Sequence, residues 1–254
     1  MSALCVGSSL GLARWRYIAL FGVLFGLACL ECDAQVILRL ARIENVPDQQ
    51  VGAEILVAVY GKLGIQLQFV DGPAKRSLIE SSEGRLDGEI QRVLAVQSEY
   101  PSLIAVSEPI NYIEPIAFTK SLSFAVSGWD SLRPYKIGIV RGVGSSERGV
   151  SGMPHVSPTT TMDQMMLMLN AGHIDVAVND LFSGMLVLNR LGIQADIHPL
   201  FPMLQHIELY HFLNERHRAL VPRVEGVIRQ MKSSGELASL RKQITDRMLH
   251  QENK

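Results

Sequence analysis

Short apolar runs alternate with amphipathic stretches along most of this chain. The run "VILRLARI" (36–43) is apolar and rich in β-branched residues, which predicts a buried strand. The stretch that follows, 48–64, places Ile55 and Val59 on one helical face, so we expect a helix with Asp48 as its N-cap. A strand followed by a helix, repeated along a chain, is typical of α/β architecture.

The same order returns in the second half of the chain. "YKIGIV" (135–140) predicts a strand, and a later helix begins with a capping box formed by Thr161 and Gln164. "IDVAVND" (174–180) predicts another strand, again followed by a helix. The methionines of "MDQMMLML" fall at helical spacing and are expected in the core. A second α/β unit is therefore expected to begin near Lys120.

The last part of the chain changes character. "IELYHFLN" (207–214) alternates as a strand does, and two charged helices are expected at about 217–231 and 235–249. One strand and two helices cannot build a third domain, so we expect them to pack on a unit already made. The pattern therefore predicts two α/β lobes, each a mixed sheet flanked by helices, with a cleft between them.

The first residues read as a secretory signal rather than as part of a lobe. Arg14 and Arg16 supply a positive region, and the apolar run 17–30 is too short for a comfortable membrane span. Cleavage is expected before Gln35, which gives a signal peptide over 1–34. A lipid anchor and a retained membrane anchor are the alternatives.

Composition adds limits on stability and on partners. All three cysteines lie in the predicted signal peptide, so the mature chain has no disulfide and must be stabilised by its core. The formal net charge is −1, which favours neither a nucleic-acid nor an anionic-membrane partner. No second apolar run approaches membrane length. We expect a soluble protein, monomeric and periplasmic.

The sequence contains few signs of a catalytic or metal-binding motif. His206 and His211 are five apart in a predicted strand, so they face opposite sides and are expected at the surface or half-buried rather than on a metal. No nucleophile elbow occurs. Gly142 and Gly144 start a dinucleotide fingerprint, but Glu147 stands at its third glycine position. No cofactor, metal or catalytic residue is predicted.

Four spaced segments carry a resemblance to a known family. "GRLDGE" (84–89) closes a helix and enters a strand, and "SEPI" (107–110) follows a strand. "LRPYKIGIVRGVGSSE" (132–147) and "AGHIDVAVND" (171–180) repeat this pattern in the second lobe. In their order and spacing, over nearly all of 36–249, the chain resembles bacterial extracellular solute-binding proteins of family 3, the periplasmic receptors of polar amino-acid ABC transporters.

The resemblance implies a fold and its boundaries. It implies the two-lobed periplasmic-binding-protein fold of type II, in which two hinge strands join the lobes and the ligand binds between them. Lobe 1 would comprise 35–118 and 212–254, and lobe 2 would comprise 119–211. The chain would cross at about 117–121 and return near 209–213.

The resemblance also implies binding residues in the first lobe. The aspartate of "LDG", Asp87, is expected to organise its turn. Glu89 and Arg92, which come from the strand after it, are expected to reach the ligand, with a surface salt bridge as the alternative. The arginine that such receptors use for the ligand carboxylate is missing from "VLAVQSEYPSLIAV" (93–106). Arg92 or Arg76 could replace it.

In the second lobe, Asp180 matches the family acid that holds an ammonium group, and its alternative role is to cap the helix that follows. Arg141 is a third replacement for the missing arginine. Ser145 and its neighbours lie at a strand-to-helix turn whose N–H groups could hold one small anion, although an ordinary glycine-rich turn explains it equally well.

These residues predict a non-enzymatic protein that captures a small polar solute for the membrane permease of an ABC-type importer. A module that reports ligand binding to a membrane receptor is one alternative. An enzyme on the same fold, such as a periplasmic dehydratase, is another, and its mark would be a buried acid with a raised pKa together with product formation.

Overall fold

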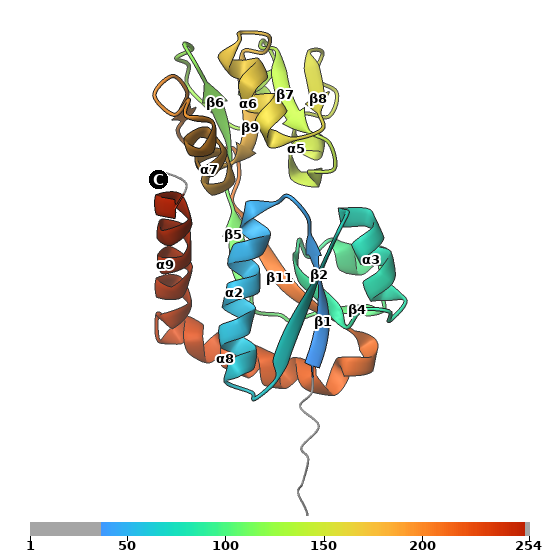
Figure 1. Cartoon of the computed structure of the whole chain (residues 1–254). Helices are drawn as coiled ribbons and strands as arrows, with labels where there is room; N and C mark the ends of the chain where they lie inside the picture. The colour runs from blue at the N-terminus through green and yellow to red at the C-terminus, as the bar shows by residue number, and fades with distance from the viewer. Residues whose placement is uncertain (1–36, 252–254) are drawn as a thin grey trace, which may run out of the picture. The chain divides into compact units, whose positions relative to one another are not determined.

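Residues 37–251 are described in a computed structural model, and they contain two mixed sheets with helices packed on them (Figure 1). The predicted two-lobed α/β fold is therefore confirmed, whereas the predicted signal peptide lies outside the described residues. In the first lobe the strand order is β2-β1-β3-β11-β4, and β5 pairs with β11 beside this path. These strands are β1 (Ile37–Ile43), β2 (Gln66–Gly72), β3 (Gly88–Arg92), β4 (Leu103–Ala105), β5 (Asn111–Ile113) and β11 (Ile207–Asn214).

The second sheet has the order β10-β6-β9-β7-β8. Its strands β9, β7 and β8 run parallel, whereas β6 and β10 are antiparallel additions at the β9 side. Its strands are β6 (Pro115–Thr119), β7 (Ile137–Val140), β8 (Val156–Thr159), β9 (Val176–Asp180) and β10 (His198–Leu200).

Helices cover both sheets. Those of the first lobe are α2 (Pro47–Gly61), α3 (Ala74–Ser82), α4 (Val96–Glu99), the 3-10 turn η2 (Glu215–Leu220), α8 (Val221–Ser233) and α9 (Glu236–Gln251). Those of the second are η1 (Trp129–Leu132), α5 (Gly144–Gly149), α6 (Met162–Asn170) and α7 (Leu181–Leu191). Both α8 and α9 pack against α2 of the first lobe.

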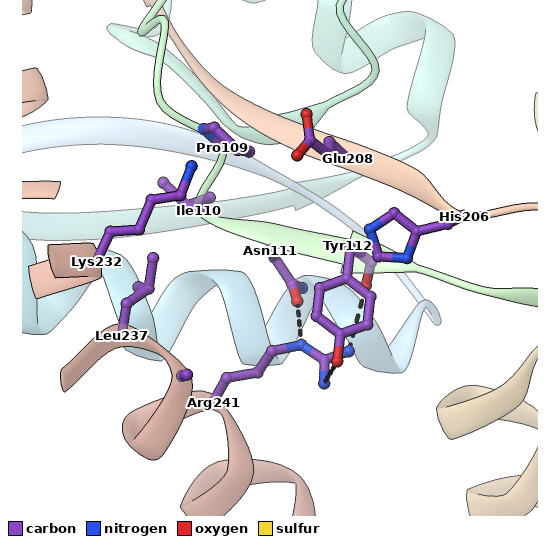
Figure 2. A pocket seen from close by; sticks show the side chains of 10 residues that line it. Pro109, Ile110, Asn111, Tyr112, His206, Glu208, Lys232, Leu237 and Arg241 are labelled. Carbon is purple, nitrogen blue, oxygen red and sulfur yellow. Dashed lines mark hydrogen bonds between the residues drawn. The ribbon is translucent and has the colours of Figure 1, made fainter. Parts of the chain in front are cut away.

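Two antiparallel strands, β5 and β11, lie where the chain passes between the sheets, and we call them the crossing strands. Tyr112 of β5 pairs with Glu208 of β11 (Figure 2). The next strand, β6, already belongs to the second sheet, where Phe118 is fully buried. Both crossings therefore come a few residues earlier than the predicted 117–121 and 209–213. The alternating pattern locates a strand, but only pairing decides which sheet each part of it joins.

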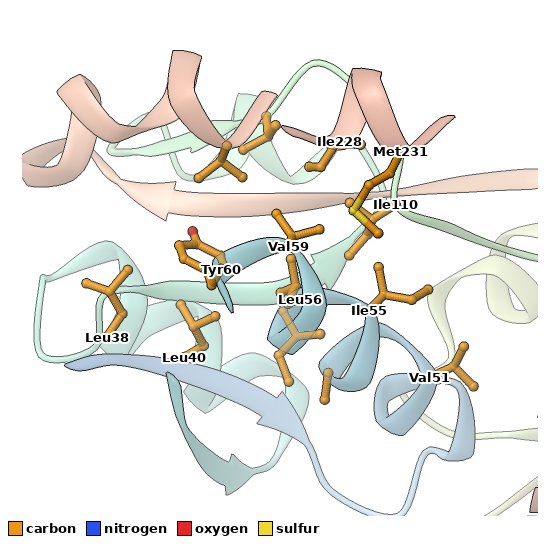
Figure 3. Close-up of a cluster of buried hydrophobic side chains, with 14 of the residues drawn as sticks. Leu38, Leu40, Val51, Ile55, Leu56, Val59, Tyr60, Ile110, Ile228 and Met231 are labelled. Atoms are coloured by element: carbon orange, nitrogen blue, oxygen red, sulfur yellow. The ribbon is translucent and has the colours of Figure 1, made fainter. Parts of the chain in front are cut away.

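The core of the first lobe lies between the sheet and helices α2, α8 and α9 (Figure 3). The predicted apolar face of α2 is confirmed, because Ile55, Leu56 and Val59 are completely buried. They meet Leu40 from β1 and Ile228 from α8 in one cluster. Truncating one such side chain to alanine typically costs about 2–5 kcal/mol, so this face fixes α2 on the sheet.

The second lobe has its own core around α6. Met165 and Met166 are fully buried, as the helical spacing predicts. The helix begins at Thr161, whose hydroxyl oxygen accepts a hydrogen bond from the Gln164 N–H at 3.1 Å. The Gln164 side chain returns to the N–H of Thr160 at 3.0 Å, so the predicted capping box forms with its second bond one residue earlier.

Residues 37–251 hold neither a membrane-spanning helix nor a metal-binding cluster. In this part of the chain no helix is long and apolar enough to cross a membrane. The same part of the chain contains no group of three or more histidine, cysteine, aspartate or glutamate side chains placed to hold a metal ion.

Candidate functional site

The two lobes meet at the carboxyl ends of their parallel strands. Helix α2 follows β1 and helix α7 follows β9, and these two helices contact each other. Because parallel strands end at the same edge of a sheet, the ends of β3 and β7 lie at these edges too. We call the ends of β1, β3, β7 and β9, together with the first turns of α2 and α7, the interlobe edge. In open α/β sheets ligands bind beyond such carboxyl ends.

Asp180 of the interlobe edge accepts hydrogen bonds from two backbone N–H groups. One carboxylate oxygen accepts from the N–H of Ser183 at 3.0 Å, so the aspartate caps α7. The other accepts from the N–H of Glu114 at 2.8 Å, which ties the cap to the first crossing. Burial raises the pKa of Asp180 despite these bonds. The predicted capping role is confirmed, and its role toward a ligand stays a prediction.

Asp48 is the opposing acid from the first lobe, and nothing in the sequence around it predicts this role. It lies in the first turn of α2 with 9% of its surface exposed, while Val46 occupies the N-cap position. The predicted cap at Asp48 is therefore wrong, because Pro47 begins the helix and the carboxylate turns to Gln91, which donates at 2.8 Å. Burial, and then the charge of Asp180, raise the pKa of Asp48 to about 7.

A chain of polar side chains connects Asp48 to the C-terminal helix. Gln91 of β3 bonds to Asp48, and its oxygen accepts from the Asn111 amide at 3.1 Å. The Asn111 oxygen in turn accepts from Nε of Arg241 at 2.8 Å. The Arg241 guanidinium also stacks on the Tyr112 ring, 3.6 Å from its centroid. Its charge acts on both Asp48 and Asp180 and opposes the rise of their pKa values.

The predicted pair Glu89 and Arg92 forms inside the first lobe. Nη2 of Arg92 lies 2.7 Å from the Glu89 carboxylate, whose other oxygen accepts from Ser81 at 2.7 Å. Arg92 also donates to the carbonyl of Ala74 at 3.0 Å. The side chains are 1% and 9% exposed, so the alternative of a surface salt bridge is wrong. A direct contact between this buried pair and a solute stays a prediction.

The remaining predicted residues lie in more exposed positions. Arg76, in the first turn of α3, is 75% exposed and pairs with Glu80 at 2.9 Å. Arg141 follows β7 and is exposed, and Ser145 is half-buried in the first turn of α5. The glycine-rich turn between them receives the Glu147 carboxylate, which accepts from the Gly142 N–H at 2.9 Å. That carboxylate occupies part of the predicted anion turn.

Asp87 has the structural role predicted for it. Its carboxylate accepts from the Arg39 N–H at 2.6 Å and bonds to Arg216 and His217 after β11. Burial acts to raise the pKa of Asp87, but these three partners outweigh it and lower that pKa. Asp87 thereby joins the turn before β3 to β1 and to the residues that follow β11.

His211 corrects one expectation about the histidines. It is completely buried under the first sheet, not at the surface or half-buried. Its Nδ1 lies 2.8 Å from the Glu89 carbonyl and its Nε2 lies 2.7 Å from the Tyr60 hydroxyl. The carbonyl can only accept, so Nδ1 carries the proton and Nε2 accepts from the tyrosine. Burial lowers the pKa of His211 to about 4, which keeps the ring neutral.

Comparison with known proteins supports the fold. No protein-family model matches the chain. An uncharacterized protein of Shewanella oneidensis is 22% identical over 183 residues, which is 68% of each chain. The amino-acid ABC transporter substrate-binding protein AbpA of Streptococcus pneumoniae, bound to L-arginine, is a solved structure with a TM-score of 0.66 at 15% identity. The match covers 84% of this chain and 96% of that one.

Two sensor domains are similar as well. The VFT2 domain of BvgS from Bordetella pertussis has a TM-score of 0.63 at 16% identity, covering 82% of this chain and 92% of that one. A histidine kinase sensor domain with similarity to periplasmic binding proteins has a TM-score of 0.62 at 17% identity, covering 83% and 96%. At such identities the likeness shows the fold, and the predicted periplasmic-binding-protein fold is thus confirmed. Membership of family 3 stays a prediction.

Proposed function

We propose that this protein binds a small polar solute bearing an ammonium or guanidinium group between its two lobes. The observation that carries the proposal is the pair of buried carboxylates at the interlobe edge, Asp48 from the first lobe and Asp180 from the second. The charge of Asp180 raises the free energy at which Asp48 carries a negative charge, and water is largely excluded from both carboxylates. A cation between them would relieve that repulsion, so such a solute would favour contact between the lobes.

The acidic group of the same solute would meet arginine. Arg92 is anchored at the carboxyl end of β3, and Arg141 and Ser145 lie at the carboxyl end of β7. Arg76 stands in the first turn of α3, whose Ala74 carbonyl bonds to Arg92. These side chains are our candidates for the carboxylate of an amino-acid-like ligand, in place of the arginine missing from 93–106. Glu89 acts by holding Arg92.

The biological setting belongs to the same proposal. We place the mature chain in the periplasm after removal of 1–34, as a monomer that delivers its solute to the permease of an ABC-type importer. The likeness to an ABC transporter substrate-binding protein supports this setting. A sensing module for a membrane receptor is the second candidate, and the likeness to two sensor domains favours it.

An enzyme remains a third candidate because of one specific observation. Asp48 is a buried acid whose pKa is raised to about 7, as an enzyme on this fold would need. We favour binding, because the partners of Asp48 are Gln91 and the acid Asp180. Incubating the protein with each solute that binds, and following the solute by NMR, separates the two, because an enzyme releases a changed product.

A thermal-shift screen tests the proposed solute class. The panel should hold basic, neutral and acidic amino acids, polyamines, sugars and carboxylates. A solute at a hundred times its Kd adds about 2.7 kcal/mol of stability, which such a screen detects readily. We expect basic amino acids or polyamines to raise the melting temperature most.

Three single variants then locate the binding site. Asp48→Asn and Asp180→Asn should each weaken the solute by about 2–5 kcal/mol, because a charge-assisted bond at a desolvated site is lost. Asp130→Asn removes the same charge from a side chain that is 91% exposed, and it should leave binding unchanged. A solute that binds all three variants equally, or a panel in which only neutral or acidic solutes bind, contradicts the proposal.

A further inference from the structure

A pocket of about 190 Å³ lies outside the interlobe edge, where the crossing strands meet α8 and α9 (Figure 2). We call it the crossing-strand pocket. Ile110, Leu237 and Ala238 supply apolar wall, while Lys232, Glu208 and Arg241 carry charge around it. The solute proposed above does not need this space. The pocket therefore needs a separate explanation.

Arg241 at the base of the pocket is a cation whose direct partners are all neutral. It donates to Oδ1 of Asn111 at 2.8 Å, to the hydroxyl of Tyr112 at 3.0 Å and to the carbonyl of Tyr112 at 3.3 Å. A guanidinium has five N–H donors, so these three bonds leave two without a partner among residues 37–251. Within that range Arg241 forms no ion pair, although it is half-buried.

The other two charged groups of the pocket each have a bonded partner. Lys232 forms an ion pair with Glu108 at 3.2 Å. Glu208 accepts a hydrogen bond from the Tyr210 hydroxyl at 2.6 Å. Asp48 and Asp180 act on Arg241 through space, without a bond to it. The two remaining N–H groups of Arg241 would suit one small anionic group with two acceptor oxygens. A carboxylate has this geometry.

The rest of the pocket limits what that anion is attached to. Ile110 is buried, and the half-buried Leu237 and the exposed Ala238 line the same pocket from α9. This apolar wall can cover a few methylene groups, and burying each of them away from water favours binding. A volume of about 190 Å³ is below the usual range for drug-sized ligands, so the occupant is small.

We propose that the crossing-strand pocket binds a small organic monocarboxylate with a short aliphatic chain. Its carboxylate would bond to the two free N–H groups of Arg241, and its chain would lie on Ile110, Leu237 and Ala238. Because the pocket joins the crossing strands to α9, an occupant would hold these elements together. The case for this pocket does not rest on the solute proposed for the interlobe edge.

Isothermal titration calorimetry with two probes of five carbon atoms each and opposite charge tests the charge requirement. Valerate has a carboxylate on a four-carbon chain, and pentylamine has an ammonium on five carbons. Valerate should bind the whole mature protein saturably with one site, and pentylamine should not. In ¹H–¹⁵N spectra valerate should shift the amides of 110–112, 208 and 237–241. Equal heats for the two probes, or valerate shifts confined to other residues, overturn the proposal.

Two phenylalanine substitutions on α9 test the location. Ala238→Phe adds a ring to the pocket and removes none of the bonds between Arg241 and the crossing strand β5. It should weaken valerate at least about tenfold. Ser239→Phe places the same ring on the neighbouring exposed residue, which does not line the pocket, and it should leave Kd unchanged. Unchanged binding to Ala238→Phe overturns the proposal. So does a loss caused by Arg141→Ala, which would put the carboxylate at the interlobe edge instead.

Discussion

The buried pair Glu89 and Arg92 yields the sharpest prediction for stability. In Arg92→Met the carboxylate of Glu89 keeps the Ser81 hydroxyl at 2.7 Å but loses its charged partner, and the Ala74 carbonyl loses a donor. Methionine fills much of the space, so the loss is mainly electrostatic. Removing one partner of a buried ion pair costs about 3–5 kcal/mol of folding free energy.

A double-mutant cycle isolates this interaction. Glu89→Gln keeps an acceptor for Ser81 and removes the charge, so Glu89→Gln with Arg92→Met should be more stable than the sum of the two single losses predicts. We expect a coupling energy of about 2 kcal/mol or more, within the range for directly bonded groups. Urea unfolding of the four proteins at pH 7 measures it.

The pH dependence provides an independent check of the same pair. Burial raises the pKa of Glu89, and without Arg92 nothing charged opposes that rise. The folded state then takes up a proton more readily than the unfolded state, so Arg92→Met should regain stability as the pH falls from 7 to 5. Arg76→Met, which breaks an exposed pair on α3, is the control and should lose less than about 1 kcal/mol. If Arg92→Met loses no more than this control, the reasoning about the buried pair is wrong.

Three further predictions concern single residues outside this pair. Asp87→Asn should cost about 1–3 kcal/mol at neutral pH, and the difference from wild type should shrink as the pH falls through the lowered pKa of Asp87; unfolding at pH 7 and pH 3 measures both. Asp180→Ala should lose about 1 kcal/mol with its cap, and Asp180→Ser, another good N-cap, should recover most of it. His211 resists protonation in the fold, so about 2 kcal/mol of stability should disappear between pH 7 and pH 5, and His211→Gln should flatten that slope.

Much of the fold follows from local sequence signals. The run 36–43, the apolar face of α2 and the capping box at Thr161 all depend on residues a few positions apart, and the structure contains each of them. The predicted positions of the two crossings are a few residues too late in the chain. β6 and β11 alternate as any strand does, and their membership in one sheet or the other is decided by partners far along the chain, such as Ala177 for Phe118.

The site was harder to predict for the same reason. Asp48 precedes a helical pattern and so reads as a cap, but its actual partner Gln91 is 43 residues away. Its neighbour Asp180 comes from the other lobe, and Arg241 comes from the last helix. Glu89 and Arg92 are three apart, so their pairing was foreseeable, whereas their burial depends on how α3 covers β3. Local spacing can suggest a pair, but it does not show which charges the fold removes from water.

Proton release on binding tests the central claim most directly. Since the pKa of Asp48 is about 7, the group carries roughly half a proton at pH 7, and a cation bound beside it should drive that proton off. Titration calorimetry of the strongest solute from the screen, in two buffers of different ionisation enthalpy, counts the protons. We predict release of up to about half a proton per solute at pH 7 and almost none for Asp48→Asn. Tight binding with no proton release in the wild type, or the same release in Asp48→Asn, would contradict a solute site built on Asp48 and Asp180.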